Sequence, residues 1–173
     1  MKVAAIVVGS YFWLVPGVSA QGIDDAQIAS VVVTANQVDV DAGRLATSRS
    51  TSREVKEFAQ LMITDHTAVN KSASDLVAKL KVTPRDNPTS QSLKAGGEKN
   101  LAHLKTLKDA AFDKAYVDHE VAYHQQVIDA LDKTLIPGAT NDDLKALLIK
   151  VRPAFVAHLE HAKSLQASLQ QKS

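Results

Sequence analysis

The sequence predicts an all-α fold, and more specifically an up-down bundle of four long helices. Three observations support this prediction. From Asp24 onward apolar residues recur every three to four positions, no alternating β-branched run indicates a strand, and most connections between periodic segments are short. Long amphipathic helices with short connections each bury one apolar stripe, and an antiparallel bundle is the simplest way to do so. A chain of 173 residues, 45% of them hydrophobic, suits one globular domain.

The first two helices are predicted at about residues 24–48 and 52–81. The first ends where the sequence becomes rich in Ser and Thr, at residues 48–52. Thr51 and Glu54 then have the spacing of a capping box, in which each side chain satisfies a free backbone N–H of the first turn. We therefore expect the second helix to begin beside these two residues.

A third, weaker helical segment is predicted at about residues 89–107, as the crossover between the second and fourth helices. Pro84 and Pro88 stop the second helix and form the longest loop. Gly96 and Gly97 lie in the middle of the third segment. Because each glycine costs about 1 kcal/mol in a helix, we expect this extra helix to be short or bent.

The last two helices are predicted at about residues 109–135 and 141–170. Pro137 ends the first of them. Asn141 is a good N-cap for the second, because its side chain can accept a hydrogen bond from the first turn. Pro153 lies inside that helix and should kink it, since it removes one backbone hydrogen bond.

Residues 1–20 have the pattern of a secretory signal peptide, which leaves residues 21–173 as the folded domain. Lys2 precedes an apolar run that extends to Val15, and small residues precede Gln21. A retained membrane anchor is the alternative, but a span needs about 20 apolar residues and this run is shorter. We expect cleavage to give a periplasmic or secreted protein without a stable transmembrane anchor.

Composition argues against several classes of function. The formal net charge of +1 disfavours nucleic-acid binding, which usually requires a basic excess. The chain has no Cys, so disulfides, thiolate zinc sites, iron–sulfur clusters and cysteine nucleophiles are excluded. It also has no phosphate-binding glycine loop, no Gly-x-Ser-x-Gly elbow and no His-Glu-x-x-His motif. Any site chemistry therefore depends on His, carboxylates and Tyr, and the composition leaves self-association open.

Four polar residues interrupt the apolar stripes at interior positions: Asp39, His66, His124 and His158. Each lies near the middle of its predicted helix. Because the midpoints of neighbouring helices are close in an up-down bundle, these side chains should converge on one point. Burying them without partners would cost on the order of several kcal/mol, so something must satisfy them.

A divalent metal ion would satisfy these groups directly. Imidazole nitrogen and carboxylate oxygen suit zinc, copper or iron. Glu120 lies four residues before His124 on one helix face, and Asp65 flanks the same region, so both could bind the metal or hydrogen-bond a ligating ring. The predicted metal residues are His66, His124, His158, Asp39, Glu120 and Asp65. Since no Glu-x-x-His pair occurs, a di-iron site is disfavoured and a mononuclear one is not.

A closed polar network is the alternative interpretation, in which these residues bond one another, fix the helix register and bind nothing. The remaining histidines, His103, His119 and His161, are expected at the surface. Asp113 and Tyr116 are spaced three residues apart, and we expect a structural hydrogen bond between them.

Several motifs resemble those of the bacterial DUF4142 family. They are residues 43–46 after an acidic pair, the Met-x-x-Asp-His element that ends residues 55–66, the Phe-Asp-x-x-Tyr element of residues 112–116, and Pro153 followed by His158. The resemblance covers about residues 24–169 and implies an exported, ferritin-like helical bundle with no assigned biochemical function. The family pattern falls on Asp39, Asp65, His66, Asp113, Tyr116, His124 and His158. The family usually has Glu where Asp39 stands, and the shorter side chain reaches less far.

Two functions remain open from the sequence. The first is a periplasmic metal-binding bundle for metal handling or stress protection. The second is a non-catalytic structural or stress protein whose polar core sets helix register. An enzyme of the ferritin-like kind is the weaker hypothesis, because the paired-carboxylate motif is missing.

Overall fold

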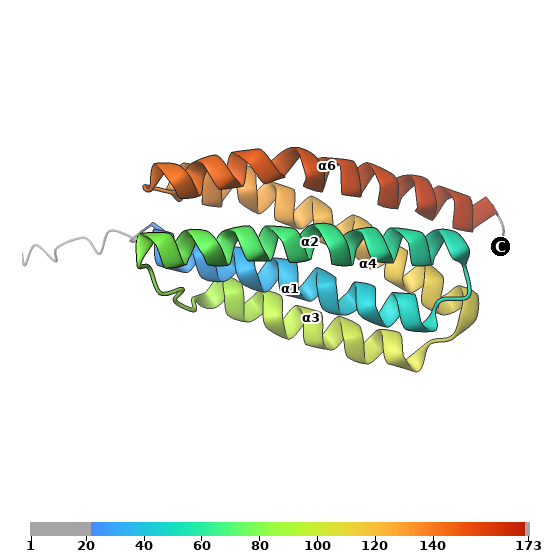
Figure 1. Ribbon diagram of the computed structural model, residues 1–173. Helices are drawn as coiled ribbons and strands as arrows, with labels where there is room; N and C mark the ends of the chain where they lie inside the picture. The colour runs from blue at the N-terminus through green and yellow to red at the C-terminus, as the bar shows by residue number, and fades with distance from the viewer. Residues whose placement is uncertain (1–21, 172–173) are drawn as a thin grey trace, which may run out of the picture.

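The computed structural model describes residues 22–171, and these residues form helices with no strand among them. The elements are α1 (Asp25–Arg49), α2 (Arg53–Leu80), α3 (Pro88–Thr106), α4 (Asp109–Ala130), the π-helix η1 (Leu131–Leu135), the short α5 (Ile136–Gly138) and α6 (Asp142–Gln171). The five long helices alternate in direction and lie lengthwise against one another (Figure 1). The all-α prediction is confirmed, and the helices begin and end close to the predicted positions.

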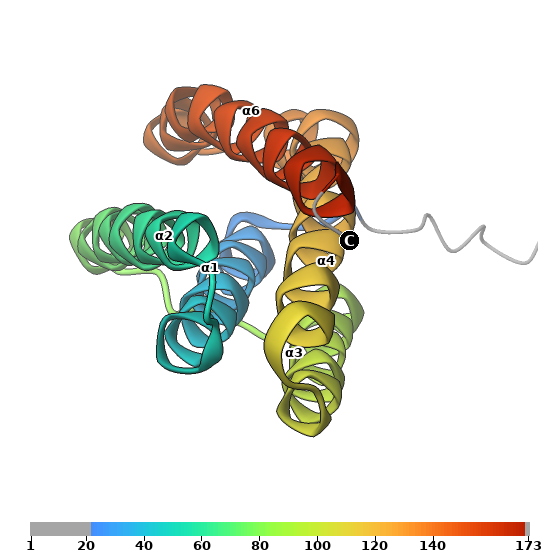
Figure 2. The ribbon, with the colours of Figure 1, turned by 90° about the vertical axis from the view of Figure 1, so that its right-hand side faces the viewer.

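The long helices pack in a definite order. α1 packs extensively against α2 and α4 against α6, while α2 also contacts α6 and α1 also contacts α4. The end-on view of Figure 2 shows these four helices around a common interior, with α3 on one side against α1 and α4. The connection from α2 to α4 is thus itself a long helix that covers one side of the other four.

The hydrophobic core divides into two clusters, one toward each end of the helices. One cluster includes Ile28 of α1 and Leu148 of α6, and the other includes Phe58 of α2 and Phe112 of α4. Asn36 and Asp39 of α1, His66 of α2 and Glu120 of α4 fall between residues of the two clusters along their helices, and His124 and His158 lie where the first cluster ends. The interior therefore has a polar layer between two apolar ones.

The start of α2 differs by one residue from the prediction. Ser52, and not Thr51, caps the helix: its hydroxyl accepts a hydrogen bond from the Val55 N–H at 3.3 Å and donates one to Glu54 at 2.9 Å. The cap is the residue directly before the first helical one, Arg53, so the capping side chain must come from position 52.

Pro88 also has a different role from the predicted one. It occupies the first turn of α3, where its missing N–H would have no partner in any case. Asn87 caps this helix by accepting hydrogen bonds from the N–H groups of Thr89 and Ser90 at 2.9 and 3.1 Å. The loop, residues 81–87, thus begins and ends one residue earlier than predicted.

The paired glycines do not interrupt α3, which is continuous over 19 residues. Gly97 is buried against α1, and a Cβ atom there would lie 2.7 Å from Cγ2 of Val38. A Cβ atom on Gly96 would meet nothing within 4 Å. Gly97 thus lowers the helix propensity of α3 but allows this helix to approach α1 closely. The resulting packing offsets the propensity cost.

We expect Gly97→Ala to destabilise the protein by about 1–2 kcal/mol, because the new methyl overlaps Val38. Gly96→Ala is the matched control, and it should stabilise by up to about 1 kcal/mol, since it adds helix propensity in open space. Chemical denaturation measures both changes. Combining Gly97→Ala with Val38→Ala should recover much of the loss, and additive losses would contradict a direct clash.

The last helices depart from regular geometry in one place. The predicted α4 continues to Leu135, but its last turn is the π-helix η1, and the helical path ends only at Gly138. Asn141 caps α6 as predicted by accepting from the Leu144 N–H at 3.1 Å, and α6 runs through Pro153 without a break.

Two sequence predictions concern membrane passage. The predicted signal peptide, residues 1–20, lies outside the residues that the structure describes. Among the helices of residues 22–171, none combines the length and apolarity that crossing a bilayer requires.

Candidate metal centre

The polar layer between the two apolar clusters contains six side chains from four helices, none more than 5% exposed. They are Asn36 and Asp39 of α1, His66 of α2, Glu120 and His124 of α4, and His158 of α6. Each occupies a position that the helical period assigns to the interior face. The predicted convergence of polar residues from α1, α2, α4 and α6 is therefore present.

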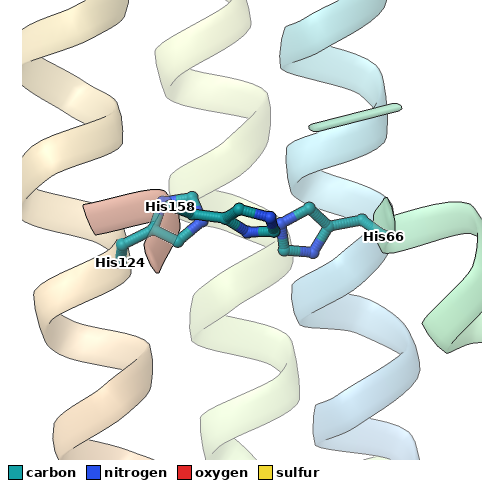
Figure 3. A group of neighbouring side chains, drawn as sticks. All are labelled: His66, His124 and His158. Atoms are coloured by element: carbon teal, nitrogen blue, oxygen red, sulfur yellow. The ribbon is translucent and has the colours of Figure 1, made fainter. Parts of the chain in front are cut away.

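The three buried imidazoles face one another at the centre of this layer (Figure 3). Their ring centroids are 5.2 Å apart for His66 and His158, and 5.5 Å apart for each of the other two pairs. One nitrogen from each ring lies within 4.8 Å of the other two. Three nitrogen donors at these separations could hold one metal ion between them.

Each of the three rings has one nitrogen in a hydrogen bond and one without a partner. The bonded pairs are His66 Nδ1 with the Asn36 side-chain oxygen at 2.8 Å, His124 Nδ1 with the Glu120 carbonyl at 3.0 Å, and His158 Nε2 with Asp65 at 2.9 Å. All three partners are oxygen acceptors, so the bonded nitrogen carries the proton and donates. The nitrogens left over are His66 Nε2, His124 Nε2 and His158 Nδ1, all buried without a hydrogen-bond partner.

The orientation of Asn36 is itself fixed. Its side-chain N–H donates to the Val32 carbonyl at 2.7 Å, which directs the amide oxygen toward His66. An oxygen in that position requires the proton on His66 Nδ1 and leaves the lone pair on Nε2. Hydrogen bonds of this kind behind a ring are typical of metal-binding histidines, because they select the ligating tautomer.

Burial keeps these imidazoles neutral. It lowers the pKa of His124 to about 4 and that of His66 well below its usual value, and the neighbouring histidines lower both further. Burial also lowers the pKa of His158, although the Asp65 carboxylate partly opposes this shift. At neutral pH all three rings therefore offer an unprotonated nitrogen, which is the form that binds a metal ion.

Two carboxyl groups adjoin the imidazoles. Asp39 is 3.5 Å from His66 Nδ1, and Glu120 is 3.5 Å from His124 Nδ1. Burial raises the pKa of Asp39 to about 8 and that of Glu120 well above its usual value, and the proximity of Asp39 raises the latter further. With His124, the two carboxyls form a second group whose ligand atoms lie within 4.8 Å of one another.

The stability of the metal-free protein should have a maximum between about pH 6 and pH 7. Four histidines have lowered pKa values in the folded chain: His66, His119, His124 and His158. Below pH 6.5 the unfolded chain therefore binds more protons on them than the folded chain does, and the free energy of unfolding falls as the pH falls. Between pH 6.5 and 8 the folded chain retains carboxyl protons that the unfolded chain has already lost, so stability falls as the pH rises.

Thermal unfolding at pH 5, 6.5 and 8.5 in the presence of a chelator measures this profile. A transition temperature that rises steadily from pH 5 to pH 8.5 would contradict the burial of the carboxyl pair. The double variant Asp39→Asn with Glu120→Gln is the control, because it should remove the decline on the alkaline side.

The six predicted metal residues thus fall into three structural groups. His66, His124 and His158 form the facing triad, and Asp39 and Glu120 form the adjacent carboxyl pair. Asp65 belongs to neither group of potential ligands; it is partly exposed and bonds Nε2 of His158. Its geometry matches the second of its two predicted roles, which is to orient a ring.

Some residues near the centre differ from the sequence expectations. Asn36 was not singled out, although it lies three residues before Asp39 on the same helix face. His119 is partly buried, and its Nδ1 is shielded from solvent without a partner, so its assignment to the surface was wrong. The hydrogen bond expected between Asp113 and Tyr116 is absent, because the buried Tyr116 hydroxyl has no partner.

The other two histidines are exposed, as predicted. His103 lies on α3, away from the polar layer. His161 packs its ring edge-on against Phe58 with the centroids 5.0 Å apart, so it contacts the core without joining the imidazole triad.

Comparison with known proteins identifies one relationship. A family model described as a domain of unknown function (DUF4142) matches residues 16–165, which is most of the chain. No curated protein and no solved structure matches the chain.

Proposed function

We propose that this chain, which belongs to the DUF4142 family, is an exported protein that binds one divalent metal ion through His66, His124 and His158. The role of such a site would be metal handling or protection against stress. We further propose that α1, α2, α4 and α6 form a ferritin-like four-helix bundle with α3 in the crossover.

One observation carries the proposal: three buried imidazoles face one another, and each has one nitrogen without a hydrogen-bond partner. The other nitrogen of each ring is bonded to an oxygen acceptor, so the lone pair lies on the nitrogen without a partner. Leaving a buried polar atom unsatisfied costs about 1–3 kcal/mol. A cation between the rings would bond all three of these nitrogens and so offset the cost of each. Nitrogen donors favour zinc, copper or iron.

The alternative function, a structural protein whose polar layer only fixes the helix register, accounts for less of the geometry. A register-fixing network would pair its members with one another. Here Asn36 and Asp65 bond one nitrogen of His66 and of His158, and the second nitrogen of each ring remains without a partner. The two functions differ in one measurable respect, because a register network binds no ion.

The test is metal binding by the protein purified without an affinity tag. After chelator treatment, calorimetric titration with Zn²⁺ and with Co²⁺ should give one ion per chain. At a hundredfold excess of ion over the dissociation constant, linkage gives about 2.7 kcal/mol of stabilisation, or roughly 5–10 °C in the unfolding temperature. No bound ion and no thermal shift with these ions, Cu²⁺ or Fe²⁺ would leave the register function as the better account.

The proposal of export rests on the signal-peptide pattern of residues 1–20. Expression of the full chain in a bacterium with an outer membrane should give a periplasmic product that begins at about Gln21. N-terminal sequencing of that fraction checks this, and a full-length product in the membrane fraction would favour a retained anchor instead.

A further inference from the structure

A cavity of about 480 Å³ lies beside the imidazole centre. It is enclosed by α1, α3 and α4 with η1, and by residues of α2 and α6 on its inner side. Pockets that bind small organic molecules commonly have volumes of about 300–1,000 Å³. The cavity is therefore large enough for an aromatic or short aliphatic compound.

The lining determines the charge of a suitable ligand. None of the residues that line the cavity is Asp, Glu, Lys or Arg, and most are aliphatic. His119 is the imidazole of the wall, and its Nδ1 atom is shielded from solvent. A charged ligand would lose its hydration here without gaining an ion partner. The cavity thus favours a neutral, lipophilic molecule.

One unfilled hydrogen bond gives the site its polar contact. His119 stacks on Tyr123 with the ring centroids 5.5 Å apart, and its Nδ1 atom is shielded from solvent without a partner. The Tyr123 hydroxyl is already engaged, since it donates to the Ala35 carbonyl at 3.0 Å. A ligand hydroxyl would suit Nδ1 in either tautomer, because a hydroxyl can donate or accept.

The entrance lies between α3 and α4, which contact each other only sparsely. Exposed Thr89, Ser92 and Gly96 of α3 and exposed Gln126 of α4 belong to the cavity lining and form its polar rim. On the inner side, Leu131 and Leu135 of the π-helix η1 line the wall. π-Helical turns are frequent at functional sites.

We propose that this cavity is a binding site for a neutral, lipophilic small molecule that carries one hydroxyl group, such as a phenol. The molecule enters between α3 and α4 and bonds His119. Phe155 separates this site from the imidazole centre: it lines the cavity, and its ring centroid lies 5.1 Å from that of His66. The proposal does not depend on metal binding, because no member of the imidazole triad lines the cavity.

The experiment is calorimetric titration of the folded full-length domain with 1-naphthol, 1-methylnaphthalene and naphthalene-1-sulfonate, with and without Zn²⁺. We expect 1-naphthol to bind about fivefold more tightly than 1-methylnaphthalene, since one buried hydrogen bond distinguishes them. The sulfonate should not bind, because its charge has no partner in the cavity. Failure of 1-naphthol to bind under either condition would overturn the proposal.

Two variants locate the binding. Gly96→Trp should abolish binding of both neutral compounds, because the indole closes the rim where a side chain meets no neighbouring atom. Ala95→Trp is its matched control, an exposed neighbour on α3 outside the lining, and it should bind as the wild type does. His119→Phe should keep both compounds bound and remove the preference for 1-naphthol.

The opposite results would refute the assignment. Unchanged binding in Gly96→Trp would place the compounds elsewhere, and a retained preference in His119→Phe would exclude the proposed hydrogen bond. Val127→Phe fills the cavity from α4 and provides an independent check, since it should also abolish binding. Loss of Zn²⁺ binding would leave these outcomes unchanged, so the two proposals can fail separately.

Discussion

Replacing His66, His124 or His158 by Gln will lower the affinity for Zn²⁺ more than about a hundredfold in each case. Residues that merely orient a metal ligand change affinity by about 10–100-fold, and removal of a ligand should exceed that. Glutamine retains a hydrogen-bonding side chain of similar length, so the helices can still pack. Competition with a chromogenic chelator measures the change, and circular dichroism checks that the variants fold.

The matched controls for this experiment are His103→Gln and His161→Gln, since both side chains are exposed and outside the triad. They should bind Zn²⁺ with the affinity of the wild type. If they lose the ion while the triad variants keep it, the bound metal lies at the surface. Equal affinity in all five variants would remove the buried centre as the binding site.

Exchanging the buried acids for amides, Asp39→Asn with Glu120→Gln, should have two opposite effects. Zn²⁺ affinity should fall about 10–100-fold, because three neutral imidazoles leave the +2 charge of the ion uncompensated in a water-poor interior. Without metal, stability at pH 8 should rise by about 1–3 kcal/mol, since two acids that resist ionisation are replaced by neutral groups.

Calorimetry and chemical denaturation measure these two quantities on the same samples. Asp75→Asn with Glu98→Gln is the control for net charge, because it removes two acids from the surface. It should change neither quantity by much. A double core variant that binds Zn²⁺ as tightly as the wild type would show that the carboxyls do not supply the compensating charge.

Much of the fold could be predicted because each long helix buries a stripe with a clear period. The same logic predicted the meeting of His66, His124 and His158, since midpoints of packed helices lie at similar heights. Asn36 had the same signal, three residues before Asp39 in an otherwise apolar stripe. That signal is weak on its own, because an asparagine is more often a surface residue than a core one.

Other features could not be predicted because they depend on tertiary packing. Which nitrogen of His158 carries the proton depends on Asp65, a residue 93 positions away in the chain. His119 lines the same cavity as residues of α3, a helix that the paired glycines suggested would be short. The same helix forms one wall of the cavity. Because the sequence of α3 predicts a helix only weakly, neither the cavity nor the place of His119 in it could be predicted.

The three imidazoles come from α2, α4 and α6, helices that span more than half of the chain. An ion held between them would act as a crosslink, fastening remote segments together much as a disulfide does in secreted proteins. Apolar clusters lie on either side of the layer, so the ion could leave only when helices separate. Its escape would then be as slow as partial unfolding, which suits long-term retention better than rapid delivery.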